Sequence, residues 1–150
     1  METSNDIDKI QEEIISEFEM FDDWMEKYEY LIELGKDLPI ISEELKTEDK
    51  LIEGCQSRVW LNSELINGKM DYRADSDAII TKGIIGLLIR VMNKQTPEVI
   101  ISNDLFFIKA IGLQEHLSPT RSNGLLGMVK RMKLEAIKSL NLKLNDFNGK

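Results

Sequence analysis

The fold is decided by residues 58–77, which read RVWLNSELINGKMDYRADSD. β-Branched and aromatic residues are frequent in the first six positions, which is typical of a strand. Later in the stretch, apolar residues alternate with charged ones, as in a strand with one face exposed to solvent. The alternating apolar positions are Met70, Tyr72 and Ala74. Between the two runs, Asn67-Gly68 is a strong signal for a two-residue hairpin turn. We therefore predict an antiparallel hairpin, to which residues 51–53 could add a short third strand.

Two amphipathic helices are predicted before the hairpin. Apolar residues recur at three- and four-residue steps in residues 7–21, and a second helical phase covers residues 24–35. Gly35, with Pro39 beyond it, is a good stop signal for the second helix. The polar and acidic segment 41–50 is expected to be a surface connection.

Helices are also predicted after the hairpin. Asp75 or Ser76 would cap a strongly apolar helix over residues 77–93, in which Gly83 and Gly86 indicate close helix packing. Shorter helices follow, and a last one begins near Ser118. Strands that run together, with helices on either side in the sequence, define the class as α+β.

The charge is uneven along the chain. The 150 residues carry a net charge of −8 and are expected to form one domain, residues 1–150. Residues 1–50 hold 17 acids and 5 bases, whereas residues 51–150 hold 10 acids and 14 bases. This balance disfavours a nucleic-acid binder, which normally has a basic face. The acidic half is either a solvated helix face or a surface for a basic protein partner.

The sequence carries no sign of secretion or of membrane insertion. Its N-terminus lacks the basic and apolar regions of a signal peptide, and its longest apolar stretch, residues 78–92, contains charges and is short for a bilayer. One cysteine, Cys55, cannot form an internal disulfide, and with one histidine, His116, it leaves no soft-ligand cluster for a metal. We expect a cytoplasmic protein with no cofactor, metal, nucleic-acid or membrane partner.

Cys55 is the one side chain able to act as a strong nucleophile at neutral pH, in its thiolate form. It lies in IEGCQSRVW, residues 52–60, at a predicted loop-to-strand junction. Gly54 lets the backbone bend and another molecule approach, Gln56 is a polar neighbour, and Arg58 is close enough in sequence to favour a thiolate. The alternative is a buried structural cysteine that packs as a small apolar side chain.

Other polar residues have both structural and functional interpretations. His116 is either a surface or capping group or an imidazole base, and its neighbours show no catalytic pattern. Asp75 and Asp77 are most simply explained by helix capping. The start of the last helix, with Ser118 and Arg121, could bind an anion or stabilise a thiolate delivered from elsewhere in the fold.

Several blocks of this sequence resemble the SufE-type sulfur acceptors, a family that includes the CsdE branch. They follow the family's order over roughly residues 22–138. The blocks are WMEKY, LIELG and LP within 24–39, IEGCQSRVW at 52–60, DSDA and KG within 75–83, TP at 96–97, and LQEHLSPTRSNG at 113–124. The cysteine block is specific, and the HLSPTRS block agrees with it independently. Residues 1–21 depart from the family as an extra acidic helix.

The resemblance implies a small antiparallel sheet of about three strands covered by helices, like that of the IscU-type iron–sulfur scaffold proteins. It implies a sulfur-transfer accessory protein rather than a stand-alone enzyme. The first partner would be a cysteine desulfurase of the SufS or CsdA type, to which the pyridoxal phosphate belongs. Cys55 would take sulfane sulfur from that enzyme as a persulfide, stimulate the enzyme, and pass the sulfur to an iron–sulfur scaffold complex.

The resemblance also implies roles for residues near Cys55. Arg121, with the adjacent helix terminus, would stabilise the anionic sulfur, and Asp77 would help to hold the cysteine loop closed. His116 would shape the site rather than donate a proton. Two other functions are considered: a regulatory module that docks on the desulfurase without carrying sulfur, and a thiol peroxidase or redox sensor, which the absence of a resolving cysteine disfavours.

Overall fold

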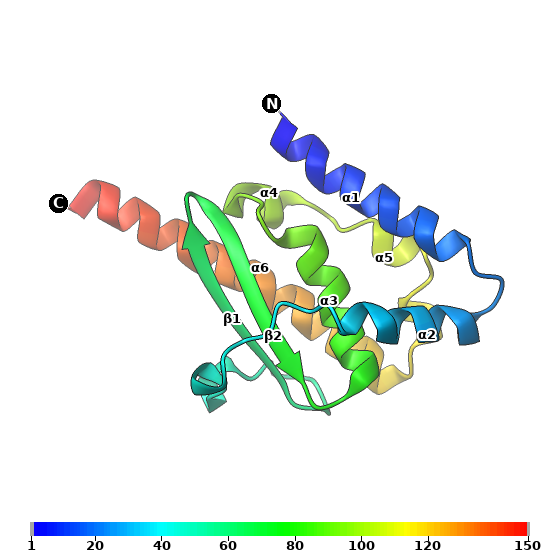
Figure 1. Ribbon diagram of the computed structural model, residues 1–150. Helices are drawn as coiled ribbons and strands as arrows, with labels where there is room; N and C mark the ends of the chain where they lie inside the picture. Colours follow the sequence, from blue (N-terminus) through cyan, green and yellow to red (C-terminus); the bar gives the residue numbers. More distant parts are fainter. Residues whose placement is uncertain (1, 150) are drawn as a thin grey trace.

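The computed structural model describes the backbone of residues 2–149 and the side chains of residues 7–142. Its elements follow the order α1 (Glu2–Glu19), α2 (Trp24–Gly35), η1 (Glu43–Leu45), η2 (Glu48–Lys50), β1 (Val59–Ile66), β2 (Lys69–Ser76), α3 (Ile79–Met92), α4 (Pro97–Ser102), α5 (Phe107–Ala110), η3 (Gln114–His116) and α6 (Pro119–Gly149). In Figure 1 the hairpin lies beside α3, and the long α6 crosses behind both. The fold is α+β, as the sequence predicts.

The predicted hairpin is present. β1 and β2 pair antiparallel, from Val59 opposite Ser76 to Ile66 opposite Lys69. The turn residues Asn67 and Gly68 have φ angles of 54° and 81°. A type I′ turn needs positive φ at both central positions, which Asn-Gly supplies at low cost.

The third strand is reduced to a single bridge. Leu51 pairs with Trp60 on one edge of the sheet, and Ile40 pairs with Ala74 on the other. The described part of the chain therefore has a sheet of two strands rather than about three. The reason is local, because η2 ends at Lys50 and Gly54 already turns the backbone with φ 91°, which leaves too few extended residues for a strand.

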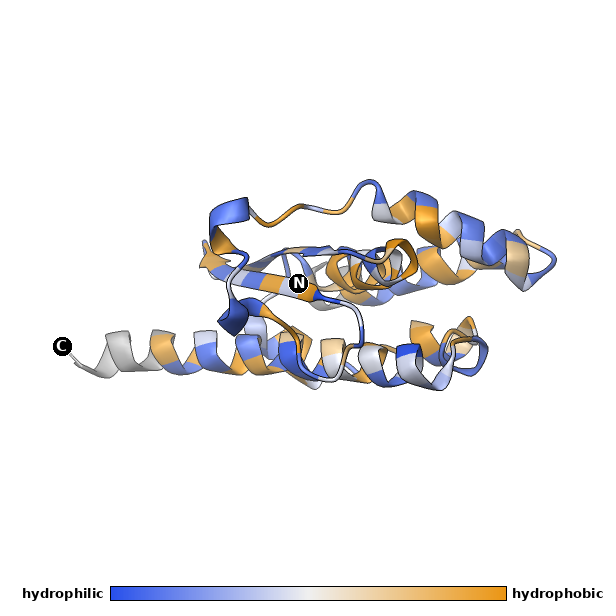
Figure 2. Cartoon of the chain, turned by 90° about the horizontal axis from the view of Figure 1, so that it is seen from below, coloured by the Kyte–Doolittle hydropathy of each residue, from blue (hydrophilic) through white to orange (hydrophobic). Residues whose placement is uncertain are grey.

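Helix α3 is the centre of the core. Nine of its 14 residues are buried, and Figure 2 shows it orange on most sides, above the layer formed by α6. A helix that is apolar on most sides has to be covered on most sides. The cover comes from α1, α2, β2 and α6, all of which contact α3. None of the described helices is both long and apolar enough to cross a membrane.

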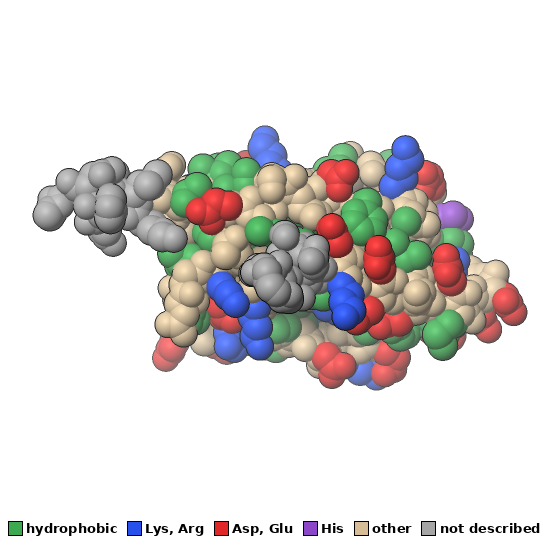
Figure 3. Space-filling view, turned by 90° about the horizontal axis from the view of Figure 1, so that it is seen from above, with side chains coloured by type: hydrophobic (Ala, Val, Ile, Leu, Met, Phe, Trp, Pro, Cys, Tyr) green, Lys and Arg blue, Asp and Glu red, His purple; other side chains and the backbone are tan. Residues whose placement is uncertain are grey.

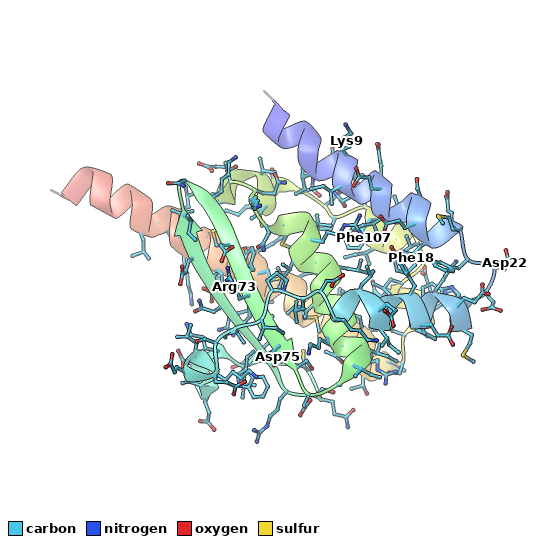
Figure 4. All side chains as sticks on the ribbon, viewed as in Figure 1. Lys9, Phe18, Asp22, Arg73, Asp75 and Phe107 are labelled. Atoms are coloured by element: carbon cyan, nitrogen blue, oxygen red, sulfur yellow. The ribbon has the colours of Figure 1, made fainter. Side chains whose placement is uncertain are left out.

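The predicted start of α3 is wrong by two residues, and so is its predicted cap. The N-cap residue is Ala78, and no side chain caps the helix. Asp75, labelled in Figure 4, instead pairs with Lys46 at 2.6 Å and with Lys82 at 3.4 Å. Ser76 Oγ accepts a hydrogen bond from Ala78 N at 3.2 Å. Because β2 continues to Ser76, the Asp75 side chain pairs with two lysines instead of capping the first turn of α3.

Helices α2 and α3 approach so closely that Gly83 has no room for a side chain. A Cβ atom on Gly83 would lie 2.2 Å from the Leu31 carbonyl oxygen, and one on Gly35 would lie 3.0 Å from Gly83 N. Close packing is thus confirmed as the reason for Gly83. A Cβ on Gly86 would be 3.8 Å from Leu34 O, which is an ordinary contact.

Helix α1 packs into the core instead of extending from it. Ile7, Ile14 and Phe18 are each no more than 1% exposed. Figure 4 shows Phe18 close to Phe107 of α5, whereas Lys9 points away from the body of the protein. The buried Gln11 is satisfied, since its amide nitrogen donates to Asn103 Oδ1 at 3.0 Å and its oxygen accepts from Phe107 N at 3.2 Å. On the face seen in Figure 3, which α1 crosses, carboxylate side chains reach the surface.

Candidate functional site

Cys55 lies on a short loop between the Leu51 bridge and β1. At the start of the loop, Ile52 N donates a hydrogen bond to Val59 O at 2.9 Å. Gly54 turns the backbone with φ 91°, in the left-handed region that residues with a side chain rarely adopt. The position of the thiol therefore depends on this glycine.

Asp77 fixes the other end of the loop. Its carboxylate accepts a hydrogen bond from Arg58 N at 3.1 Å, and its own N–H donates to Arg58 O at 3.3 Å. From the junction between β2 and α3, Asp77 thus contacts the backbone just before β1 twice. Two hydrogen bonds to the Arg58 backbone are the kind of contact that would keep the loop in its closed position.

The cysteine loop packs against two glycines of α6. A Cβ on Gly124 would lie 3.4 Å from Cys55 Sγ, and a Cβ on Gly127 would lie 2.8 Å from Glu53 O. Any larger residue at position 127 would push against the loop backbone itself. Neither glycine was among the predicted site residues, although their spacing of three residues within a predicted helix is a signal for such a contact.

The thiol is half-buried, and its chemistry follows from that burial. Cys55 Sγ lies 3.7 Å from Gly124 O, to which the thiol can donate a weak hydrogen bond. Burial alone raises the pKa of the Cys55 thiol, because it disfavours the charged thiolate. Arg58 is exposed, and nothing in the site shows the thiolate stabilisation that its place in the sequence suggested. With the loop closed, Cys55 is therefore held as a neutral thiol.

A cavity of about 210 Å³ opens beside the thiol. It brings Cys55 and Gln56 together with Arg121, although Arg121 is more than sixty residues away in the sequence. The remaining wall combines hydroxyl groups with apolar side chains, namely Ser57, Thr81, Ser118, Thr120, Ile84 and Met128. Ser57 and Thr81 were not among the predicted site residues. Ser57 is two residues from Cys55 in the cysteine block, whereas no spacing in the sequence connects Thr81 to Cys55.

Arg121 occupies the first turn of α6, with its side chain exposed at the cavity. Its backbone N–H donates to Ser118 Oγ at 3.2 Å, so Ser118 acts as a cap for this helix. Among the described side chains Arg121 makes no ion pair. Its guanidinium is available to an anion at the mouth of the cavity.

His116 does not line the cavity. Its ring stacks on Trp24 at a centroid distance of 4.2 Å, and its Nδ1 lies 2.9 Å from Gly112 O. The Tyr28 hydroxyl donates to the His116 carbonyl oxygen. These contacts tie α2 to the segment that precedes α6. His116 therefore has no direct contact with the cavity or the thiol.

Within the described residues, no group of three or more His, Cys, Asp or Glu side chains could hold a metal ion. The chemistry that the site offers is that of one sheltered sulfur, a cavity next to it, and one arginine.

The fold and the site define a small α+β protein with one cysteine on a closed loop, and comparison with known proteins gives its family. The family model SufE, described as an Fe-S metabolism associated domain, matches residues 12–136. The chain belongs to the SufE family, which is associated with iron–sulfur metabolism.

Its relatives include proteins named as uncharacterized SufE-like proteins. One from Rhizobium etli is 41% identical over an alignment of 130 residues and covers 83% of this chain and 88% of the relative. One from Rhizobium meliloti is 36% identical and covers 83% and 93%. One from Synechocystis is 39% identical over 124 residues and covers 83% and 78%.

A solved structure shares the fold. The solution structure of a hypothetical protein from Thermus thermophilus superposes with a TM-score of 0.73 at 20% sequence identity. The match covers 88% of this chain and 96% of the Thermus protein.

Proposed function

We propose that the protein is a sulfur carrier that accepts sulfane sulfur on Cys55 from a pyridoxal-phosphate cysteine desulfurase and passes it to iron–sulfur cluster assembly. The observation that carries the proposal is the placement of one half-buried thiol on a closed loop beside the cavity that also contains Arg121. Membership of a family associated with iron–sulfur metabolism supports it.

The transfer needs no cofactor in this chain. The Cys55 thiolate attacks the outer sulfur of the persulfide on the desulfurase cysteine, and a new sulfur–sulfur bond forms at Cys55. The bond between the two sulfurs of the desulfurase persulfide breaks, and its electron pair stays on the desulfurase cysteine. The proton released from Cys55 balances the one that this departing thiolate takes up. The number of sulfur–sulfur bonds is unchanged, so neither an oxidant nor a reductant is consumed.

The closed loop suits a carrier between its two partners. A water molecule occupies about 30 Å³ in the liquid, so the cavity of about 210 Å³ has room for the outer sulfur atom. Arg121 lines the same cavity and would stabilise the negative charge of a persulfide. Burial raises the pKa of Cys55 and so disfavours the thiolate that has to attack. Attack therefore requires either that the loop opens or that the partner stabilises the thiolate.

The proposal is tested by incubating the protein with purified desulfurase and cysteine and then measuring the intact mass. We expect one added sulfur atom that maps to Cys55 and is removed by reductant. Absence of this adduct, while the desulfurase itself carries a persulfide, would refute the carrier function. Cys55→Ser should retain the fold and lose the stimulation of the desulfurase. If Cys55→Ser stimulates as well as the wild type, the protein is a regulatory docking module instead.

A further inference from the structure

One buried hydroxyl group faces the cavity beside Cys55. Thr81 of α3 lines this cavity and is 6% exposed. Its hydroxyl has no hydrogen-bond partner among the described residues, yet it is not sealed inside the protein, because the one enclosed side-chain atom of that part of the chain that lacks a partner is Gln95 Oε1. The Thr81 oxygen therefore faces free space, and the cavity is the space that Thr81 lines. Since a buried hydroxyl is unfavourable without a partner, its partner has to come from the group that occupies the cavity.

The other hydroxyl groups of the cavity lie nearer to solvent. Ser118 and Thr120 are exposed, and Ser57 is half-buried. Ser118 Oγ also has a structural partner already, because it accepts a hydrogen bond from Arg121 N at 3.2 Å. Water competes for hydrogen bonds at the mouth of a cavity, whereas a hydrogen bond in a buried, less polar setting is electrostatically stronger. Thr81 is thus the hydroxyl whose hydrogen bond to a bound group would contribute most.

The buried wall around Thr81 is otherwise apolar. Ile84 lies one helical turn further along α3, and Met128 faces the same cavity from α6. Both side chains are 1% exposed. A negative charge next to such a wall is costly unless it receives a hydrogen bond. Thr81 is the side chain that can donate one from this buried part of the lining.

The position of Thr81 in its helix also favours an anion. Thr81 lies in the first turn of α3, which starts at Ile79, contains no acidic residue in that turn and has no side-chain cap. Asp77, just before the helix, accepts its hydrogen bond from Arg58 N instead. The partial positive charge of the helix terminus therefore remains near Thr81. At the mouth of the cavity, Arg121 adds a full positive charge.

A persulfide on Cys55 would bring an anion into this space. Its outer sulfur would lie about 2 Å from Cys55 Sγ, the length of a sulfur–sulfur bond. In the unloaded protein Cys55 Sγ lies 3.7 Å from Gly124 O, so the thiol has a partner other than Thr81. The Thr81 hydroxyl is consequently left for the atom that loading adds.

We propose that Thr81 is a sulfur-binding residue, whose hydroxyl donates a hydrogen bond to the outer, anionic sulfur of the Cys55 persulfide. Arg121 stabilises the same charge from the mouth of the cavity. No bond to Thr81 forms or breaks during sulfur transfer, so the balance of that reaction is unchanged. This proposal rests on the carrier function proposed above.

The test compares three variants with the wild type. Thr81→Val keeps nearly the same shape and removes the hydroxyl, and Thr81→Ser keeps a hydroxyl. Thr120→Val is the matched control, because it makes the same change at an exposed threonine of the same cavity. Each protein is loaded chemically: Cys55 is converted to a mixed disulfide with dithiodipyridine, and hydrosulfide then displaces the pyridinethiol and leaves a persulfide. Intact mass confirms one added sulfur.

The measurement is a pH titration of the ultraviolet absorbance of the persulfide anion, taken as the difference between loaded and unloaded protein. A hydrogen bond to the charged form favours that form, so its loss should raise the pKa of the persulfide. We expect the persulfide of Thr81→Val to be a roughly tenfold weaker acid, which raises the midpoint by about one pH unit. Thr81→Ser and Thr120→Val should stay close to the wild type.

A second measurement separates sulfur binding from a structural role of Thr81. The pH profile of iodoacetamide alkylation of unloaded Cys55 should be the same in all four proteins, because the thiol itself lies against Gly124 O. An equal shift of this profile in Thr81→Val would overturn the proposal, since Thr81 would then act on the cysteine loop.

Three other results would also overturn the proposal: a wild-type persulfide midpoint in Thr81→Val, an equal rise in Thr120→Val, or no rescue by Thr81→Ser. The carrier function fails separately. Absence of a sulfur adduct after incubation with the desulfurase refutes the carrier, whereas the chemically loaded proteins still decide whether Thr81 binds the outer sulfur.

Discussion

The Cys55 thiol is kept neutral by burial, and the loop that buries it is held by a small number of contacts. Asp77 binds the backbone at Arg58, and Gly127 allows the backbone at Glu53 to lie against α6. Each of these contacts can be removed without altering the cysteine. The reactivity of Cys55 therefore reports directly on loop closure.

Gly127→Ala should open the loop. The added Cβ would lie 2.8 Å from Glu53 O, and a backbone atom cannot yield without moving the loop. Greater exposure should lower the pKa of Cys55 toward its ordinary value, so the pH profile of alkylation by iodoacetamide should shift to lower pH and the rate at neutral pH should rise. Gly86→Ala is the control, because its Cβ meets only ordinary contacts. Identical pH profiles for Gly127→Ala and the wild type would contradict this account of the loop.

Asp77→Ala should have a related effect from the other end of the loop. It removes the acceptor for Arg58 N and should cost about 1 kcal/mol in the free energy of unfolding, measured in urea. Alkylation of Cys55 should also accelerate. Asp77→Asn keeps an oxygen acceptor at the same place and should stay close to the wild type in both measurements. If Ala and Asn behave alike, the hydrogen bond does not hold the loop.

At the scale of elements, α1 is fixed to α2 and α3 by a polar cluster around Glu17 as well as by its apolar face. Arg90 of α3 donates two hydrogen bonds to Glu17, at 2.8 and 2.7 Å, and the Tyr30 hydroxyl of α2 donates to the same carboxylate. The hydrogen bond from Arg90 lowers the pKa of Glu17, whereas burial and then Glu17 raise the pKa of Tyr30 to about 12. Three helices thus meet at one ionised carboxylate.

Glu17→Gln should destabilise the protein at neutral pH by about 1–2 kcal/mol, because it removes the charge from a bidentate pair. The folded pKa of Glu17 lies below its ordinary value of 4.5. Its contribution is therefore fully present above that ordinary value and is lost as the pH falls through the folded pKa. Urea unfolding of the two proteins at neutral pH and in acid should show a difference that shrinks in acid. A difference that does not depend on pH would mean that the charge of Glu17 contributes nothing.

At the scale of the whole molecule, the acidic N-terminal helix belongs to the core. It buries Ile7, Ile14 and Phe18 against α3 and α5. Of its described carboxylates, Glu17 is partly buried against Arg90 and the others are exposed. The excess of acid in residues 1–50 therefore does not mark a separate arm.

Phe18→Ala should consequently lower the free energy of unfolding by about 3–4 kcal/mol, as is usual for a buried phenylalanine. Met20→Ala, at a side chain that is 77% exposed just beyond α1, should change it by less than about 0.5 kcal/mol. Denaturant titrations of both variants give the comparison. A small effect of Phe18→Ala would show that α1 is an appendage after all.

The sequence by itself determined the hairpin, the stop of α2 at Gly35 and the α+β class. These depend on local backbone preferences and on short motifs, which act over a few residues. It failed at the junction of β2 and α3, because Asp75 pairs with Lys46 and Lys82 and Asp77 binds the backbone at Arg58, so neither carboxylate caps the start of α3. It also overestimated the third strand.

Tertiary structure alone decided the state of the thiol and the make-up of the cavity. The pKa of Cys55 depends on burial by α6, and the cavity joins residues 55–57 to α3 and to the start of α6. The tertiary structure also places His116 outside the cavity, because its ring stacks on Trp24. Burial and side-chain contacts between segments far apart in the sequence exist only once the core has formed. The local sequence around Cys55 therefore cannot specify them.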